Sequence, residues 1–472
     1  MKSKSFFWYD LETTGTDTAL DRAVQFAGVR TDENLEEIEE GYELVCRPPL
    51  ERLPHPEAVA ITRFDYNEFL RKGLIENEFC RRISDEFERN ETCVAGFNSI
   101  RFDDELIRQL FYRNFRDPYA REWKNGNSRW DLIDPLRAAY ALRPEGINWP
   151  RKKDGSVSFR LEDLASANAV VHENAHDALS DVRATIGLAR ILKKAQPKLF
   201  DFSLSLRSKI NVQRILNPAG KNCAVYVSPK IGSENSNLGI VFPVCSHPIN
   251  KNSIICFDLK FDPSCLEELS SDALEKGLDG SEFPEEANET HLFEINTGRL
   301  PFVAPLNVLN EETLSRLNID LDLAKERSEF LASSIVLGKK IKTSYSNRTF
   351  ELDPDPELQL YGGFFTDGDR ELMKETVRSE PDLLSGFSEK FQDPRLAEIL
   401  FRYRCRNFPE TLSSWEVDRW KGFLDHRLEK GKIIEKYISE TQRLISSSGG
   451  DNIYALNRLL EYYEYVAQQI QR

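Results

Sequence analysis

The sequence lacks long hydrophobic runs, closely spaced cysteine pairs and internal repeats. No stretch of its 472 residues approaches the roughly 18 apolar residues that a membrane-spanning helix needs, so we expect no membrane span. The short apolar patch near the N-terminus ends at Asp10, which argues against a secretory signal peptide. The eight cysteines form no C-x-x-C pair, a pattern that favours buried thiols in a reducing cytosol. We therefore expect a cytoplasmic globular protein.

Positive charge is scarce overall and concentrated in one window. Lys and Arg number 63 against 78 Asp and Glu, and the net charge of −15 by itself argues against a polyanionic partner. Residues 1–100 have 12 basic and 21 acidic side chains, and residues 161–472 have 38 and 48. Residues 101–160, however, have 13 basic and 9 acidic side chains. This window is either a chance cluster or a groove for an anion.

Periodicity and composition divide the chain into three regions. Alternating strands and helices over residues 1–196 predict an α/β domain. Short apolar segments separated by Gly, Ser, Asn and Pro predict a small β-rich domain over 197–350. After a Pro-rich joint, residues 353–472 are mostly helical in pattern.

Two carboxylates lie at the end of the first predicted strand. In FFWYDLETTG, Asp10 and Glu12 are two residues apart, so both side chains point to the same face of the strand. Like charges side by side repel each other, and an uncompensated buried charge is costly. The ordinary alternative is an exposed strand end with two solvated acids.

Three other segments carry polar groups that can join this pair. GFNSIRFDDELI places Asp103 at the start of a helix, where the helix dipole favours a carboxylate in any case. NAHDALSD places His176 and Asp181 five residues apart on the clearest helix of the chain. SFRLEDL contains Arg160. Taken singly, each has a structural alternative: a helix-terminal acid, a solvent-exposed histidine or a surface arginine.

Together these segments match a known family. D-x-E on a first strand, an Asp opening a central helix and H-x4-D on a later helix make up the pattern of the DEDDh exonucleases. The chain resembles, more closely, the bacterial exodeoxyribonuclease I family of single-strand-specific exonucleases. The resemblance is strong over 6–190 and 355–412 and weak over 205–350. It is carried by FFWYDLETTGTDTALDRAVQFAGVRTD, GFNSIRFDDELIRQLFYRNFRDPYAREW, NSRWDLIDPLRAAYALRPEGINWP, SFRLEDL, NAHDALSDVRATI, LYGGFFTDGDRELM and LFRYRCRNFPETL.

The resemblance implies five catalytic residues. Asp10, Glu12 and Asp181 would ligate metal, Asp103 would complete the acidic cluster, and His176 would be the general base. Oxygen ligands suit hard cations, so we expect two Mg²⁺ ions, with Mn²⁺ as a substitute. Two such ions about 3.5–4 Å apart can activate a water and stabilise the leaving oxygen of a phosphodiester.

The resemblance also implies a set of substrate contacts. Arg160 would grip a phosphate, Glu12 would also touch the substrate, and the residues expected to contact the single strand are Arg108, Tyr119, Trp123 and Arg137. All of the contacts other than Glu12 fall in the basic window, where arginines neutralise phosphates and aromatic rings stack unpaired bases. Core packing for the two aromatic residues, and surface ion pairs for Arg108 and Arg137, are the alternatives.

The fold implied by the resemblance has three parts. An RNase H-like exonuclease domain with a mixed sheet is followed by an SH3-like β-barrel and a helical domain, which together enclose the strand and make digestion processive. In RYRCRNFP, the alternating Arg402, Arg404 and Arg406 either line this channel or belong to a structural strand or turn. The family also binds the acidic C-terminal tail of the single-stranded DNA-binding protein. Arg143 matches a position implicated there, while Phe202 stands where some relatives have tyrosine.

The function predicted from the sequence is a monomeric, Mg²⁺-dependent 3′→5′ exonuclease. It would degrade single-stranded DNA to 5′-mononucleotides in DNA repair and recombination. A DEDDh RNase or proofreading subunit is the alternative enzyme, although such proteins usually lack the 270 or so residues that follow the first domain. A catalytically inactive DNA-binding or scaffold protein would be expected to have lost one of the five catalytic side chains, and all five are present.

Overall fold

The computed structural model describes residues 4–172, 177–269, 274, 290–346, 352–447 and 449–471. The chain forms two compact units. The first comprises Met1–Arg129, His172–Arg183 and Leu352–Arg472, and the second comprises Trp130–Val171 and Ala184–Glu351. None of the helices in the described residues is long and apolar enough to cross a membrane.

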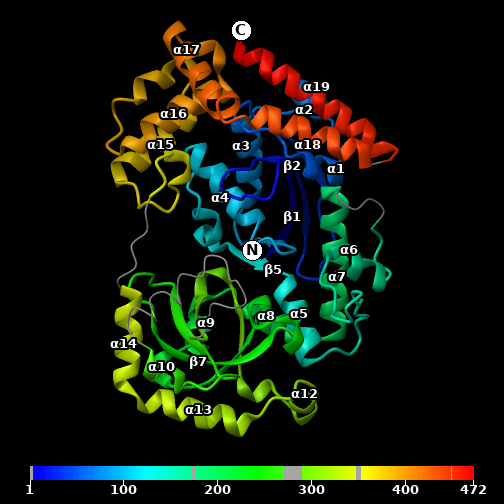
Figure 1. Cartoon of the computed structure of the whole chain (residues 1–472), viewed down its shortest axis with the longest axis vertical. Helices are drawn as coiled ribbons and strands as arrows, with labels where there is room; N and C mark the ends of the chain where they lie inside the picture. The colour runs from blue at the N-terminus through cyan, green and yellow to red at the C-terminus, as the bar shows by residue number, and fades with distance from the viewer. Residues whose placement is uncertain are drawn as a thin grey trace. The chain divides into compact units, whose positions relative to one another are not determined.

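Two five-stranded sheets organise the structure (Figure 1). One has the order β3-β2-β1-β4-β5 and the other the order β10-β6-β7-β8-β9. Their strands are β1 (Ser5–Thr13), β2 (Ala23–Thr31), β3 (Tyr42–Val45), β4 (Thr92–Gly96), β5 (Ser128–Asp131), β6 (Ala224–Val227), β7 (Leu238–Ser246), β8 (Ser253–Asp258), β9 (Leu292–Asn296) and β10 (Phe302–Pro305).

The helices of the described residues are distributed along the whole chain. They are α1 (Pro56–Thr62), α2 (Tyr66–Lys72), α3 (Glu76–Phe87), α4 (Asp103–Arg113), α5 (Ile133–Leu142), α6 (Leu161–Ala167), α7 (Ala178–Ala195), α8 (Pro197–Ser205), α9 (Lys209–Ile215), α10 (Cys265–Glu268), α12 (Glu311–Arg316), α13 (Leu321–Ser333), α14 (Ile335–Ser346), α15 (Asp367–Arg378), α16 (Pro394–Asn407), α17 (Ser414–Leu424), α18 (Ile433–Ser447) and α19 (Asp451–Gln471).

The first sheet is mixed, as the sequence predicts. Strand β1 pairs antiparallel with β2 and parallel with β4. Helices α3 and α4 cover one face, where Phe79, Phe87 and Leu106 pack against Phe7 and Phe26 of the sheet. This apolar burial fixes β1 in the middle of the sheet, and its C-terminal end therefore becomes a rigid platform for the two carboxylates.

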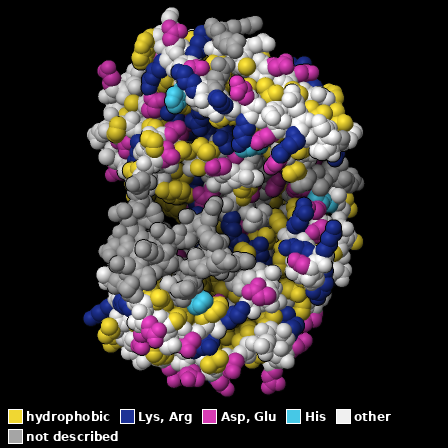
Figure 2. All heavy atoms as spheres, in the orientation of Figure 1, with side chains coloured by type: hydrophobic (Ala, Val, Ile, Leu, Met, Phe, Trp, Pro, Cys, Tyr) yellow, Lys and Arg dark blue, Asp and Glu magenta, His cyan; other side chains and the backbone are white. Residues whose placement is uncertain are grey.

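The second sheet is antiparallel throughout its described pairings. Its apolar core includes Val225, Val241 and Ile254, in agreement with the β-rich domain predicted from the alternating apolar segments. Figure 2 shows acidic side chains along its lower edge, where Figure 1 places α12 and α13. Like-charged exposed side chains of this kind keep a surface hydrated.

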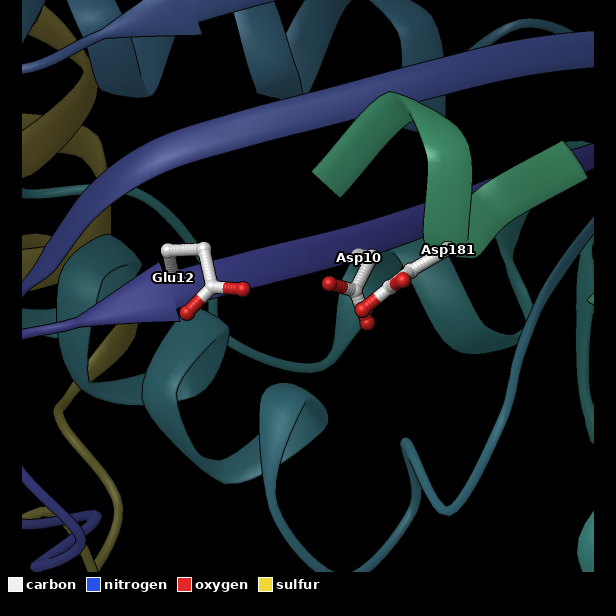
Figure 3. Close-up of side chains that lie close together, drawn as sticks. All are labelled: Asp10, Glu12 and Asp181. Carbon is white, nitrogen blue, oxygen red and sulfur yellow. The ribbon is translucent and has the colours of Figure 1, made fainter. Parts of the chain in front are cut away.

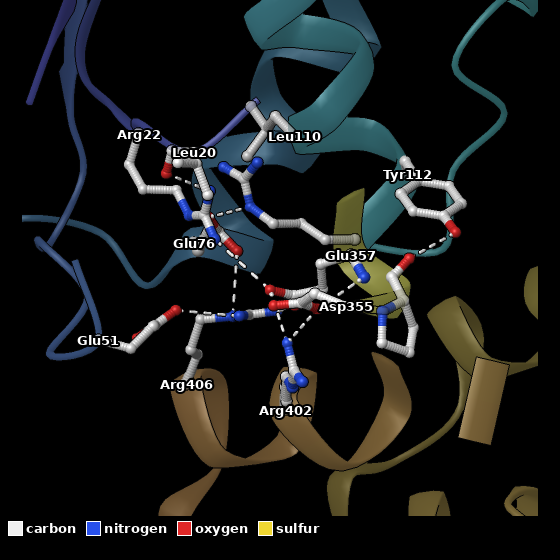
Figure 4. A network of polar contacts seen from close by, with 12 residues as sticks. Leu20, Arg22, Glu51, Glu76, Leu110, Tyr112, Asp355, Glu357, Arg402 and Arg406 are labelled. Atoms are coloured by element: carbon white, nitrogen blue, oxygen red, sulfur yellow. Dashed lines mark hydrogen bonds and ion pairs between the residues drawn. The ribbon is translucent and has the colours of Figure 1, made fainter. Parts of the chain in front are cut away.

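A buried network of ion pairs joins the C-terminal part of the chain, from Glu357 onward, to Arg22 and Glu51 in its N-terminal part (Figure 4). Glu357 lies between Arg406, at 2.5 Å, and Arg22, at 3.5 Å, and all three side chains are almost fully buried. Arg406 also contacts Glu51 at 3.0 Å. Burial raises the pKa of the Glu357 carboxyl, but Arg406 and Arg22 outweigh this and hold the pKa well below its usual range.

The alternating arginines of RYRCRNFP lie in helix α16, so the predicted strand or turn is wrong. Arg402 pairs with Asp355 at 2.6 Å, Arg404 pairs with Glu416, and Arg406 belongs to the buried network. All three side chains are buried. Their charges are therefore neutralised inside the protein, and the prediction that they line a strand-binding channel is replaced by a structural role.

Removing one member of the buried network should destabilise the protein strongly. Replacing Glu357 by Gln removes the carboxylate that pairs with Arg22 and one of the carboxylates that pair with Arg406, and we expect a loss of about 3–5 kcal/mol in the free energy of unfolding. Glu371→Gln is the matched control, because Glu371 forms an exposed pair with Lys374, and exposed pairs contribute little to stability. Denaturant titration followed by circular dichroism measures both. Equal losses would show that the network contributes no more than a surface pair.

Candidate functional site

Three carboxylates from two distant segments meet at the end of β1. Asp10 and Glu12 project from β1 and Asp181 from the first turns of α7 (Figure 3). Their nearest oxygen atoms all lie within 4.8 Å of one another, and the three side chains are partly buried. The register of β1 against β2 shifts between Glu12 and Thr13, a β-bulge of the kind that re-aims side chains beside functional sites.

The described charged groups that shift the pKa values of Asp10 and Glu12 are other acids, whereas the pKa of Glu357 is shifted by arginines. Burial, together with the charges of Asp10 and Asp181, raises the pKa of Glu12 to about 9. Burial, Asp103 and Asp181 raise the pKa of Asp10 well above its usual range. Two unit charges at 4.8 Å repel by roughly 3.5 kcal/mol at an effective dielectric constant of about 20. Such a set of oxygens is suited to a divalent cation.

Asp103 and Asp104 open α4 and have different surroundings. Asp104 accepts hydrogen bonds from Arg121 at 2.6 Å and Arg129 at 2.5 Å, as well as from the Tyr9 hydroxyl. Burial raises the pKa of Asp104, but the two guanidinium groups outweigh it and leave the pKa below its usual range. Asp103 instead acts on the pKa of Asp10. Asp104 is therefore a structural acid paired with arginines, whereas Asp103 adds to the negative potential at Asp10.

A histidine that the sequence analysis did not single out contacts the cluster. His172 Nε2 lies 2.5 Å from Oδ1 of Asp181, and its side chain is only 8% exposed. The signal for it was its position in the sequence, four residues before His176 and nine before Asp181. His176 itself, the predicted general base, lies outside the described residues.

Three of the residues predicted to contact the single-stranded nucleic acid lie in the first unit: one arginine, which is already paired, and two aromatic residues. Arg108 is buried and pairs with Glu105 at 2.7 Å and Glu122 at 2.8 Å, and its guanidinium lies over the Tyr119 ring at 5.4 Å. Trp123 is 68% exposed, so core packing is excluded for it. An exposed indole on a folded surface is available to stack on a ligand.

A cavity of about 710 Å³ adjoins these aromatic residues. Tyr119 and Trp123 line one side of it, and residues that the sequence analysis did not predict line the other. Among these, Phe364 is 88% and Tyr361 is 62% exposed. The basic residues of its lining are Arg116, Lys124, Arg370, Lys374 and Arg378. Aromatic faces interleaved with cations suit an unpaired nucleic-acid strand.

The other predicted substrate and partner residues belong to the second unit. Arg137 pairs with Asp134 at 2.6 Å, and the exposed Arg160 pairs with Glu162. The guanidinium of Arg143 donates hydrogen bonds to the backbone carbonyls of Leu142 and Val308. The ring of Phe202 packs edge-on against Phe302. The exposed Arg160 retains most of its surface for another contact, whereas Arg137 is largely buried.

Comparison with known proteins covers the whole chain. The family described as Exonuclease matches residues 7–189, the Exonuclease I SH3-like domain matches residues 207–347, and the Exonuclease I C-terminal domain matches residues 354–468. Exodeoxyribonuclease I of Haemophilus influenzae is 41% identical, with 98% of each chain covered. The predicted order of an exonuclease fold, an SH3-like domain and a C-terminal domain is thereby confirmed.

Solved structures agree with this assignment. Exonuclease I of E. coli in complex with a dA16 oligonucleotide has a TM-score of 0.94 and 38% identity, and the match covers 98% of this chain and 100% of that one. A zinc-bound form of the E. coli complex with single-stranded DNA has a TM-score of 0.93 and 37% identity, with 99% and 100% covered.

The raised pKa of Glu12 predicts a dependence of stability on pH. The folded state binds this proton more tightly than the unfolded chain does, so the stabilisation is present below the ordinary glutamate pKa and is lost as the pH rises toward about 9. In a chelating buffer, we expect the unfolding temperature of the wild type to fall more steeply from pH 5 to 9 than that of Glu12→Gln.

A divalent cation should reduce the difference between wild type and Glu12→Gln in the pH dependence of the unfolding temperature, because a bound cation replaces the lost proton as the counter-charge. Thermal melts at closely spaced pH values, with and without Mg²⁺, measure it. Identical pH profiles for wild type and Glu12→Gln in the chelator would contradict the electrostatic account of the cluster.

Proposed function

The chain belongs to the exodeoxyribonuclease I family, and we propose that it is a Mg²⁺-dependent exonuclease that degrades single-stranded DNA processively in the 3′→5′ direction to 5′-mononucleotides. The observation that carries the proposal is the cluster of Asp10, Glu12 and Asp181. Family membership alone does not preserve a catalytic site, but the convergence of three partly buried carboxylates from two segments costs stability, and a bound cation would offset the repulsion among them.

The donor set fits a hard divalent cation. Three carboxylates whose oxygens lie within 4.8 Å of one another can share an ion, and burial together with neighbouring acids raises the pKa values of Asp10 and Glu12. Asp10, Glu12 and Asp181 are the proposed ligands. A bound cation supplies Lewis acidity and neutralises charge at the scissile phosphate.

The remaining chemistry is assigned to other side chains. His176 accepts the proton of the attacking water, since an imidazole titrates near neutral pH. Asp103 maintains the negative potential that retains the cation, and Arg160 binds a phosphate of the strand. The exposure of the Arg160 side chain, at 69%, supports this role.

The single strand is proposed to follow the aromatic cavity. Trp123 and Phe364 present exposed rings on which bases can stack. Arg370 and Lys374, which form exposed pairs with Asp367 and Glu371, line the same cavity and are proposed to exchange these partners for phosphates. Tyr119 lines the cavity, and Arg108 lies against the Tyr119 ring. Because Arg108 already pairs with Glu105, we assign it the role of positioning Tyr119. Stacking is tolerant of sequence, which suits an enzyme that digests any strand. Arg137 is proposed as a further contact to the strand.

The proposal extends to domains and cellular role. We place the domains at 1–196, 197–350 and 353–472, a division supported by the three matched families. The protein is proposed to act as a cytoplasmic monomer in DNA repair and recombination and to bind the acidic tail of the single-stranded DNA-binding protein through Arg143.

Loss of one ligand should abolish digestion and leave strand binding intact. For Asp10→Asn we expect loss of Mg²⁺-dependent cleavage, because removal of one carboxylate weakens the hold on the cation. Digestion of 5′-labelled single-stranded DNA, duplex DNA and RNA, with Mg²⁺ or chelator, measures activity, direction and preference together.

Asp104→Asn is an unsuitable control, since Asp104 neutralises two arginines, so Asp382→Asn serves as the comparison, because Asp382 is exposed and does not line the cavity. Wild-type cleavage by Asp10→Asn would refute the metal assignment. Tight binding without any cleavage by the wild type would favour the inactive DNA-binding alternative.

The aromatic cavity can be tested by binding alone. We expect Trp123→Ala and Phe364→Ala each to weaken single-strand binding by about 1–3 kcal/mol, with similar losses for oligo-dA and oligo-dT. Trp415→Ala is the matched control, because Trp415 is 67% exposed in the same unit but does not line the cavity. Fluorescence anisotropy in a chelating buffer separates binding from digestion. If all three variants bind equally well, the strand does not use this cavity.

A further inference from the structure

The contact between His172 and Asp181 is unusual because it involves a proposed metal ligand. The separation of 2.5 Å joins Nε2 of His172 to Oδ1 of Asp181, and the side chains are 8% and 14% exposed. A carboxylate can only accept a hydrogen bond, so the imidazole donates from Nε2. A hydrogen bond to a charged acceptor in a partly buried place is among the stronger ones in proteins.

The loop that carries His172 is attached to the same helix as Asp181. Two residues before His172, Val170 packs against Gly187 of α7, where an added Cβ would lie 2.6 Å from Val170 Cγ1. The Val170 amide also donates to the carbonyl of Ala165 at 2.9 Å, which closes the end of α6. These contacts hold the loop at a defined position along α7, so the imidazole reaches Asp181 from a fixed site.

Asp181 needs such support because its neighbours in the cluster repel it. Oxygen atoms of Asp10, Glu12 and Asp181 lie within 4.8 Å of one another, so the charges of these carboxylates repel one another. A carboxylate with one oxygen bound to His172 cannot rotate freely away from Asp10 and Glu12.

We propose that His172 is a positioning residue that holds the Asp181 carboxylate in the orientation in which, with Asp10 and Glu12, it binds a divalent cation. The inference rests on the proposed function, since it concerns the same metal site. Hydrogen bonds to metal ligands of this type commonly change metal affinity or activity by about 10–100-fold.

Metal binding without DNA provides the test. Free Mn²⁺ is followed by electron paramagnetic resonance during titration of the full-length protein, for wild type, His172→Ala and His172→Gln. We expect His172→Ala to raise the Mn²⁺ dissociation constant by about 10–100-fold. His172→Gln should recover most of the affinity, because the glutamine amide can donate the same hydrogen bond. Excess Mg²⁺ should correspondingly restore the digestion rate of His172→Ala.

Two further variants provide the controls. His426→Ala removes an exposed histidine of the same unit and should leave Mn²⁺ affinity unchanged. Asp181→Asn removes the proposed ligand itself and should lower affinity at least as much as His172→Ala. Thermal melts in chelator identify any variant whose loss of affinity reflects unfolding.

The outcomes separate this inference from the proposed function. Unchanged Mn²⁺ affinity in folded His172→Ala, with a wild type that binds Mn²⁺, would overturn the positioning role alone. Equal losses in His172→Ala and His172→Gln would identify the imidazole as a direct ligand and would also overturn it. A wild type that binds no Mn²⁺ and digests no DNA would remove the proposed function and this inference together.

Discussion

Repulsion among the carboxylates at the end of β1 is the interaction on which the site depends. Asp10 and Glu12 are brought together by strand geometry, and Asp181 by the packing of α7. The fold supplies enough apolar burial, through Phe7, Phe26 and their neighbours, to hold these groups in place against their repulsion. The unfavourable electrostatic energy is then available to attract a cation, which is how a metal site can be assembled before the metal binds.

The same chain handles buried acids in two ways. Asp104 and Glu357 are each surrounded by arginines, and their pKa values are lowered. Asp10 and Glu12 have other acids as their nearest charged neighbours, and their pKa values are raised. Burial penalises the charged form in all four, so the difference comes from the charge of the neighbours. This contrast separates the structural ion pairs of Asp104 and Glu357 from the proposed metal site more clearly than the presence of acidic residues does.

The sequence predicted most elements and the acidic cluster but misjudged the alternating arginines near the C-terminus. Residues spaced by two suggest a strand, yet Arg402, Arg404 and Arg406 lie in α16 and are buried. Each is satisfied by an acid from another part of the chain, such as Glu51 for Arg406, and sequence periodicity carries no information about partners 355 positions away. For the same reason, Phe364 and His172 gained their significance only when Trp123 and Asp181 were found beside them.

The sequence by itself determined that Asp10 and Glu12 share a face, because side chains alternate along any strand. It also determined the family, because whole motifs matched in order along the chain. Only the tertiary structure decided which buried acids lie beside arginines and which beside other acids, which arginines are already paired and which aromatic rings are exposed. Those properties depend on contacts between residues far apart in sequence, and pKa values and accessibility are set by the complete surroundings of a group rather than by its sequence neighbours.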